Sequence, residues 1–539
     1  MKRADGYYLR KTIPALAAAA VMFFLPVGAV FLRSFSDVSG LAGTLSDPYT
    51  WRLLGFTAMQ AALSAFFSIL IALPFAAFFS KYSFRGRRAV LTMCDAAFAL
   101  PAILAVLGFV IYYGNNGLVN RFLAAASGGR WSVKILYSFK AIILAHVYLN
   151  LPIALSLITN SLSQMPATEE NASRLLGASE IRTFFRVTLP KVRNTVLAAF
   201  TLIFLFCFPS FLIVMTLGGN PKFYTIEAEI YKRTYTDMNP ASSAALAVVS
   251  FLVMALLLVL TGYGKEEKRV SRSRRSLIPA RGRKLALAVV LMVILFLFMA
   301  PPLLSILYRS FFTRDGGFSF DAWATIARRS ANGVATGLNA VLNSLAIAAC
   351  AAFIAVSFAS SIAIGAVRMK MRFLTLLTSL PMALGSVSLG LGFFFLAAKL
   401  PFRNIVFSYF IVLLAHTVVV LPFAVRTLLP GARAIPERLP FAAQTLGGTT
   451  REIYRRIESP MLRSYKRRAY AFAFALSLGE VNATLALGEG RVTTIPVLIY
   501  KLINQYNYQG ASALAVILIL IAAVVFAIGE KGDPDAVLS

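Results

Sequence analysis

The sequence predicts an all-α polytopic membrane protein with about twelve transmembrane helices, arranged as two homologous six-helix halves. The 539-residue chain is 58% hydrophobic and only 14% charged, with a mean hydropathy of +0.74. A soluble protein of this composition would expose too much apolar surface. Apolar runs long enough to cross ~30 Å of hydrocarbon as a helix recur about twelve times. A polar segment between such runs occurs twice, which indicates a tandem duplication.

The apolar runs divide evenly between a first half, residues 1–262, and a second half, residues 285–539. The spans expected in the first half are 12–33, 56–80, 90–113, 136–160, 195–217 and 241–262. Those expected in the second half are 284–308, 338–367, 373–398, 404–428, 468–488 and 511–528. Pro101 and Pro381 fall in the third span of each half, where we expect each to kink its helix.

The duplicated segments share a skeleton that keeps one offset of 270 residues without a gap. The residues repeated at this offset are His146 and His416, Pro152 and Pro422, Pro166 and Pro436, Gly177 and Gly447, and Pro190 and Pro460. The polar loops within the two copies span about 161–194 and 430–466. A duplicated unit of membrane helices and polar loop is typical of a transport pathway built from two related halves.

Basic residues indicate how the chain is oriented in the membrane. With the N-terminus in the cytoplasm, about two thirds of the 53 Lys and Arg residues fall in cytoplasmic segments. This bias predicts cytoplasmic N- and C-termini and places both polar loops in the cytoplasm. The net charge of +31 would suggest nucleic acid binding in a soluble protein. Here the basic segment 263–284 is interpreted as a cytoplasmic linker beside anionic lipid headgroups, so we expect no nucleic acid partner.

Metal and catalytic chemistry find little support in the composition. The chain has three cysteines, all within apolar segments, and two histidines. No metal-ligand spacing is present, and we expect no metal site and no catalytic residue. No G-x-x-x-x-G-K-[ST] phosphate loop occurs in the sequence.

The sequence of each polar loop predicts two short helices separated by a glycine. In the first copy Ala172, Leu175 and Leu176 give a short apolar face, and Gly177 interrupts it. A glycine there suits a turn between helices. The second copy repeats the pattern around Gly447. A short helix presented beside the membrane is a natural element for docking into the groove of a partner.

These loops resemble the "EAA" loop of binding-protein-dependent ABC import permeases, whose pattern is E-A-A, three residues, G, nine residues, I-x-L-P. The first copy has Asn171-Ala172-Ser173, Gly177 and Val187–Pro190 at these positions. The second has Phe441-Ala442-Ala443, Gly447 and Ile457–Pro460. The leading Glu is absent from both copies, although Glu170 stands one residue early in the first. The resemblance implies that the ATPase-coupling residues are Glu170, Asn171, Ala172, Ser173, Gly177, Ala178, Phe441, Ala442, Ala443, Gly447 and Gly448.

The segment Leu476-Ser-Leu-Gly-Glu480 is similar to the S-L-G-E segment of the fused permeases of thiamine and ferric-iron importers, and Phe206-Cys-Phe-Pro-Ser210 is closer to the thiamine type. The resemblance covers nearly the whole chain. It implies the membrane permease subunit of an ATP-driven importer in the bacterial inner membrane, moving a small solute by alternating access. The implied partners are two ABC ATPase subunits, which use ATP and Mg, an extracytoplasmic solute-binding protein and the lipid bilayer. No cofactor is expected on this chain.

Four polar residues within the spans are candidates for the substrate pathway: His146, Ser210, His416 and Glu480. Ionisable groups inside a membrane are functional candidates, but the two histidines would equally serve as hydrogen bonds that fix helix packing. An alternative function is a proton-coupled secondary transporter with His146, His416 and Glu480 as a proton relay. That alternative leaves the two duplicated loops without a role.

Overall fold

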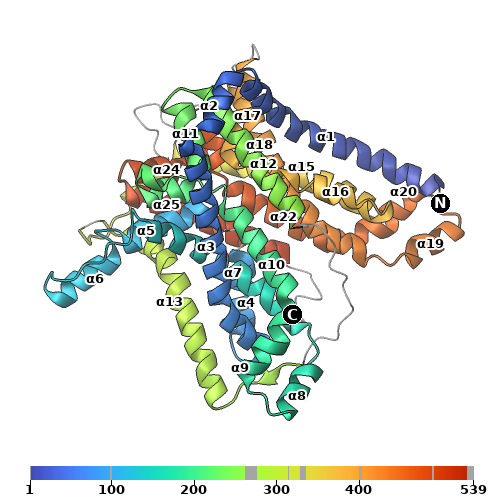
Figure 1. The fold of residues 1–539 in the computed structure, drawn as a ribbon, viewed down its shortest axis with the longest axis horizontal. Helices are drawn as coiled ribbons and strands as arrows, with labels where there is room; N and C mark the ends of the chain where they lie inside the picture. The colour runs from blue at the N-terminus through green and yellow to red at the C-terminus, as the bar shows by residue number, and fades with distance from the viewer. Residues whose placement is uncertain are drawn as a thin grey trace. The chain divides into compact units, whose positions relative to one another are not determined.

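The computed structural model describes residues 2–97, 100–261, 276–313, 315–327, 336–399, 404–487 and 491–530. They fold almost entirely into helices (Figure 1), which confirms the all-α class. Residues 263–275 of the expected linker lie outside the described residues.

The chain forms two compact units that do not follow the order of the sequence. Unit 1 comprises residues 1–51, 226–259 and 307–539, and unit 2 comprises residues 52–225 and 260–306. The first helix of the chain therefore belongs to the unit that contains most of the second half. The helix that opens the second half belongs to the unit that contains most of the first.

Ten helices of the described residues are long and apolar enough to cross a membrane: Tyr8–Phe35, Pro48–Phe79, Ala102–Ser127, Phe139–Ser163, Glu180–Cys207, Pro240–Leu260, Arg283–Phe311, Gly337–Arg368, Ile405–Ala434 and Tyr508–Gly529. A bent pair, Phe373–Ala383 with Ser386–Ala398, makes an eleventh span if it is counted as one. The polytopic architecture is confirmed, whereas the expected count of twelve is not.

The missing span is the predicted one at 468–488. There α22 (Arg463–Leu478) has only 16 residues, too short to cross ~30 Å at 1.5 Å per residue. It begins with four basic residues among its first six and ends at Leu478, immediately before Gly479. The chain then restarts as α23 (Asn482–Leu487). The apolar run is therefore continuous in sequence but not in helical structure.

Proline at the predicted kink of the ninth span has the expected effect. Pro381 lies in the 3₁₀ segment η4 (Leu380–Ala383), where the helix pair bends by 88°. In the first half, Pro101 immediately precedes α5 (Ala102–Tyr113). Proline lacks an amide donor and clashes with the preceding turn, so a helix breaks or bends there.

Unit 2 is organised around the buried helix α7 (Phe139–Ser163), which contacts α4, α5 and α10. Its elements are α3 (Pro48–Phe79), β1 (Tyr82–Ser83), α4 (Arg87–Ala97), α5, α6 (Leu118–Ser127), α7, α8 (Thr168–Leu175), α9 (Glu180–Thr183), η1 (Phe184–Thr188), α10 (Leu189–Cys207), η2 (Val214–Gly218), η3 (Pro221–Phe223), β2 (Ile278–Pro279) and α13 (Arg283–Phe311). The two short strands pair in parallel, with Tyr82 opposite Ile278.

Unit 1 is organised around α15 (Gly337–Arg368) and α18 (Ile405–Ala434), which pack against each other and against α22. Buried alanines along α15 allow this close approach. Its other elements are α1 (Lys2–Phe35), α2 (Val38–Ser46), α11 (Ile226–Tyr235), α12 (Pro240–Leu260), α14 (Asp321–Ala327), α16 (Arg372–Leu377), η4, α17 (Ser386–Ala398), α19 (Arg438–Thr445), α20 (Thr450–Ile453), η5 (Tyr454–Glu458), α21 (Ser459–Met461), α22, α23, α24 (Ile495–Asn504) and α25 (Tyr508–Glu530).

The exchanged helices pack in the same way in both units. In unit 1, Gly392 of α17 lies against the backbone of Pro26 in α1, and in unit 2, Gly108 of α5 lies against Pro302 in α13. A Cβ at either glycine would overlap the proline, so the absence of a side chain at glycine is what permits the contact. The repeated glycine–proline contact is a trace of the duplication that the loop motifs do not contain.

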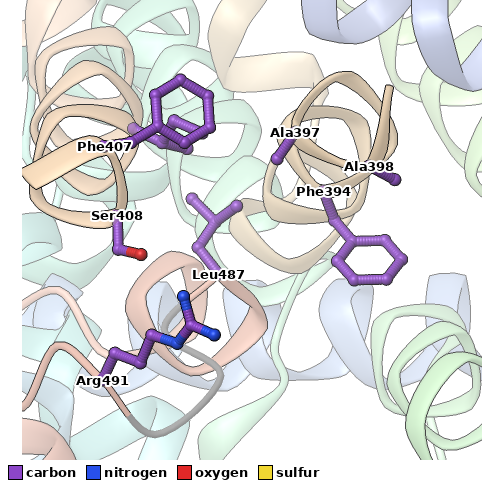
Figure 2. A pocket seen from close by; sticks show the side chains of 8 residues that line it. Phe394, Ala397, Ala398, Phe407, Ser408, Leu487 and Arg491 are labelled. Carbon is purple, nitrogen blue, oxygen red and sulfur yellow. The ribbon is translucent and has the colours of Figure 1, made fainter. Parts of the chain in front are cut away.

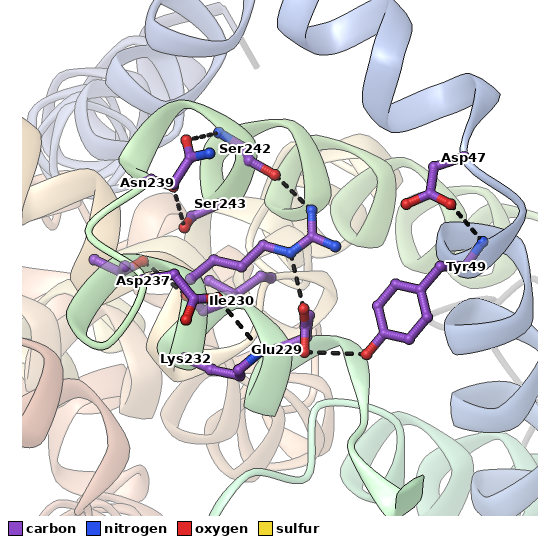
Figure 3. A network of polar contacts seen from close by, with 11 residues as sticks. Asp47, Tyr49, Glu229, Ile230, Lys232, Asp237, Asn239, Ser242 and Ser243 are labelled. Atoms are coloured by element: carbon purple, nitrogen blue, oxygen red, sulfur yellow. Dashed lines mark hydrogen bonds and ion pairs between the residues drawn. The ribbon is translucent and has the colours of Figure 1, made fainter. Parts of the chain in front are cut away.

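A polar network fixes the short helix α11 within unit 1 (Figure 3). Glu229 accepts a hydrogen bond from Arg233 Nε at 2.9 Å and from the Tyr49 hydroxyl at 3.2 Å. Arg233 also donates to Ser242, at the start of α12. Because Glu229 is neutralised by a neighbour on its own helix, α11 can be buried with this carboxylate inside.

Candidate functional site

The first polar loop folds as two short helices joined at Gly177. α8 ends at Leu175, and Gly177 has φ +83°, a left-handed conformation that favours glycine. Ser179 then caps α9 by accepting a hydrogen bond from the Arg182 amide. Helical structure continues through η1 into α10. The expected turn between two short helices is therefore present.

The second loop repeats this geometry in the other unit. α19 ends at Thr445, and Gly447 has φ +83°, the same value as Gly177. Thr449 and Glu452 form a capping box at the start of α20. The backbone amide of Thr449 lowers the pKa of the exposed Glu452 carboxyl. The Glu452 carboxylate of this capping box therefore stays ionised at neutral pH. Helical structure continues from α20 through η5 towards α22.

The exposure of the candidate coupling residues is also repeated. In both loops the positions from 171 to 177 and from 441 to 447 follow one pattern, with Ser173 and Ala443 half-buried and the rest exposed. Ala178 and Gly448 are half-buried, and their amides donate to the carbonyls of Ser173 and Ala443 at 3.1 and 2.9 Å. Ten of the eleven candidates therefore line these compact turns, five in each loop.

Large apolar side chains stand out from these turns. Leu176 and Leu446, which are equivalent by the offset of 270, are each 88% exposed. Leu175 is 89% and Phe441 68% exposed. Apolar side chains this exposed, at equivalent places in two loops, indicate a surface that a partner covers.

Glu170 does not share this exposed surface. Its side chain is buried, forms an ion pair with Lys81 at 3.0 Å and accepts a hydrogen bond from Thr188 at 2.9 Å. The equivalent position in the second loop is Pro440. Glu170 therefore links the first loop to Lys81, which follows α3, and to Thr188 in η1.

Within the membrane-spanning part, the two histidines make equivalent contacts. His146 on α7 bonds to Ser64 at 3.2 Å and to Ser210 at 2.9 Å. His416 on α18 bonds to Ser477 and Thr484, both at 2.8 Å. Each imidazole thus joins its own helix to two other segments of its unit. The structure brings His146 and Ser210 together, as two of the four predicted pathway residues.

Glu480 makes different contacts from its counterpart Ser210. It lies at the break between α22 and α23, where it accepts hydrogen bonds from the Ala483 amide at 3.0 Å and from Ser386 at 3.3 Å. Ser386 is the first residue of α17. Glu480 is therefore placed at the bend of the ninth span.

Sequence reasoning missed a second carboxylate at the same bend. Glu227 of α11 is fully buried and accepts a hydrogen bond from the Ser388 amide at 3.1 Å. A Cβ on Gly385 would overlap its carboxylate. The sequence places Glu227 in an ordinary polar segment between spans, and only the packing of α11 against α17 brings it to this position. An anion at a helix N-terminus is favourable because unpaired amides point towards it.

One pocket lies elsewhere in unit 1 (Figure 2). It is lined by Phe394, Ala397, Ala398, Phe407, Ser408, Ile411, Leu487 and Arg491. Its lining is mostly apolar and includes none of the predicted site residues. Across the described ranges, no three His, Cys, Asp or Glu side chains gather in a way that could hold a metal ion.

Comparison with known proteins fits this architecture. Residues 66–265 match the family described as binding-protein-dependent transport system inner membrane component. The chain is 29% identical to the thiamine transport system permease protein of Brucella abortus over 499 residues, covering 90% of this chain and 88% of that protein. It is 29% identical to the Salmonella typhimurium protein of the same name over 547 residues, 96% of each. The sulfate transport system permease protein CysW of Escherichia coli is 23% identical over 247 residues, covering 45% of this chain and 83% of that protein.

These matches confirm the resemblance to the permeases of binding-protein-dependent ABC importers. The chain is a multi-pass inner-membrane permease subunit of a binding-protein-dependent ABC importer. Within that class it is of the fused type, with both halves in one chain, since the thiamine permeases align along most of its length. A secondary transporter is thereby set aside.

We predict that His416→Leu destabilises the protein by about 1–3 kcal/mol, because two buried hydroxyls lose their partner. The measurement is the midpoint of chemical denaturation in detergent micelles. Thr417→Val is the matched control, since among the described residues the Thr417 hydroxyl donates to the Leu413 carbonyl of its own helix and to no other segment. A His416→Leu protein as stable as the control would show that the imidazole contacts do not support the fold.

Proposed function

We propose that this chain is the permease of an ATP-driven thiamine importer. The observation that carries the proposal is the alignment with thiamine permeases over 88–96% of their length. The sulfate permease relative covers less than half of this chain. The Phe206–Ser210 segment adds support, since it resembles the thiamine type.

Thiamine carries a permanent positive charge on its thiazolium ring, and the bend of the ninth span holds two carboxylates, the fully buried Glu227 and the half-buried Glu480. A cation in a low-dielectric pathway is stabilised by carboxylates of this kind. We assign pathway roles to His146, Ser210, His416 and Glu480, with Glu227 added. Ferric iron is the second candidate solute, on the strength of the Ser477–Glu480 segment alone.

The chain itself is not an enzyme in this proposal. ATP and Mg are used by two separate ABC ATPase subunits, each of which receives one loop. The support is the pair of exposed leucines, Leu176 and Leu446, beside glycines with the same φ. An extracytoplasmic binding protein delivers the solute. Closure of the ATPase pair then moves both loops and rocks the permease between inward- and outward-open states.

We predict ATP-dependent thiamine uptake when the chain is produced with its cognate ATPase and binding protein in cells that lack thiamine uptake. Uptake of labelled thiamine is the measurement, with unlabelled thiamine, ferric iron and sulfate as competitors. Glu480→Gln is expected to lower thiamine uptake, because a carboxylate facing the cation is lost. Uptake of ferric iron that excess thiamine does not reduce would contradict the thiamine assignment.

We predict that the double variant Gly177→Arg/Gly447→Arg abolishes uptake and reaches the membrane in normal amount. A side chain at φ +83° strains the turn, and the guanidinium obstructs the partner's groove. Uptake and co-purified ATPase are measured together. Gly28→Arg is unsuitable as a control because α1 spans the membrane. The control is Gly282→Arg, because Gly282 also has a positive φ and no heavy atom beyond its chain neighbours lies within 4 Å of the position that a Cβ would take. Normal uptake by the double variant would refute loop coupling.

We predict cytoplasmic N- and C-termini, and therefore cytoplasmic loops, from the distribution of basic residues. In a chain without native cysteines, Leu446→Cys should resist an impermeant thiol reagent in intact cells. Ser127→Cys, at the end of α6, should react with it. Rapid external labelling at position 446 would reverse the orientation.

A further inference from the structure

A buried ion pair lies beneath each of the two loops. In unit 2, Lys81 Nζ lies 3.0 Å from Glu170, and the two side chains are 12% and 3% exposed. In unit 1, Arg368 Nε lies 2.7 Å from Glu458, with side chains 13% and 0% exposed. Buried carboxylates of this kind require a paired cation.

The two carboxylates come from different places in the repeat. Glu170 is the third residue of α8, and the third residue of α19 is Pro440. Glu458 is the last residue of η5, and the last residue of η1 is Thr188. By the offset of 270, Glu170 corresponds to Pro440 and Glu458 to Thr188. The carboxylate of the pair therefore lies on the short helix α8 in the first copy and on the π-helical segment η5 in the second.

Both cations, in contrast, lie at the C-terminal end of a long helix, although their positions differ by two residues. α3 and α15 are both 32 residues long. Lys81 follows α3 by two residues, and Arg368 is the last residue of α15. A hydroxyl completes each pair: Thr188 donates to Glu170 at 2.9 Å, and Tyr8 of α1 donates to Glu458 at 3.0 Å. The same charge arrangement is built twice from different residues.

We propose that Lys81–Glu170 and Arg368–Glu458 are equivalent positioning pairs, each of which fastens a coupling loop to the end of the long helix that leads towards it. A loop moved by its ATPase then moves α3 or α15 with it. This inference rests on the proposed coupling function and adds Lys81, Arg368 and Glu458 to the residues that serve it. Lys81 and Arg368 lie outside the loop motif, and Glu458 stands at the variable position of its I-x-L-P end.

Neighbouring carboxylates provide matched controls. Glu169 adjoins Glu170 but pairs with Lys191 at the surface, where the two side chains are 52% and 39% exposed. Exposed pairs contribute little. Glu437, which precedes α19, is exposed. Glu169→Gln and Glu437→Gln should therefore leave transport unchanged.

The test transfers the carboxylate between its two positions. Glu458→Thr removes it from the second copy, and Glu458→Thr/Pro440→Glu rebuilds it in the first-copy arrangement. The reciprocal variants are Glu170→Gln and Glu170→Gln/Thr188→Glu. Each permease is purified with its ATPase and placed in liposomes. The measurement is the ratio of solute transported to ATP hydrolysed, with both amounts given per folded complex.

We expect each single variant to lower uptake per complex about tenfold relative to ATP hydrolysed, and each transplant to restore most of it. A role in stability alone would lower the yield of folded complex and leave that ratio unchanged. Wild-type ratios in both single variants, or failure of both transplants to restore the ratio, would overturn the proposal. ATPase association is measured in parallel: if it is insensitive even to Gly177→Arg/Gly447→Arg, the coupling function itself has failed.

Discussion

Polar groups buried between apolar helices have to find partners on neighbouring segments, because lipid offers none. This constraint explains most of what is specific in this chain. His146 and His416 each tie their helix to two hydroxyl-bearing segments. Glu229 is neutralised by Arg233, and Glu170 and Glu458 each receive a cation and a hydroxyl. The helices are held in register by a few such contacts, while alanine and glycine set how closely they approach.

The loops are the part of the site that the sequence predicted best. Their helix–turn–helix form depends on local chemistry: a glycine at positive φ and a Ser or Thr cap. Such features are encoded within about ten residues, so they can be recognised by pattern. The position of Glu170 beneath the loop was not predicted, because its partner Lys81 is distant in sequence.

The membrane-spanning part shows where sequence reasoning fails. Apolar periodicity found most of the spans but not the end of α22 just before Gly479, since a break in a helix need not interrupt an apolar run. The exchange of α1 and α13 between the compact units leaves no local signal. Glu227 reaches the bend of α17 only through the packing of α11. Each of these depends on contacts between segments far apart in the chain.

The central claim is that the turns at Gly177 and Gly447 are where the ATPase subunits engage this permease. The most direct measurement is disulfide cross-linking of Leu176→Cys and Leu446→Cys to cysteines in the groove of the cognate ATPase. We predict that both positions cross-link, one to each ATPase subunit. Met238 is 78% exposed and distant from both loops in sequence, so Met238→Cys should not cross-link. Cross-linking at position 238 but at neither leucine would contradict the central claim.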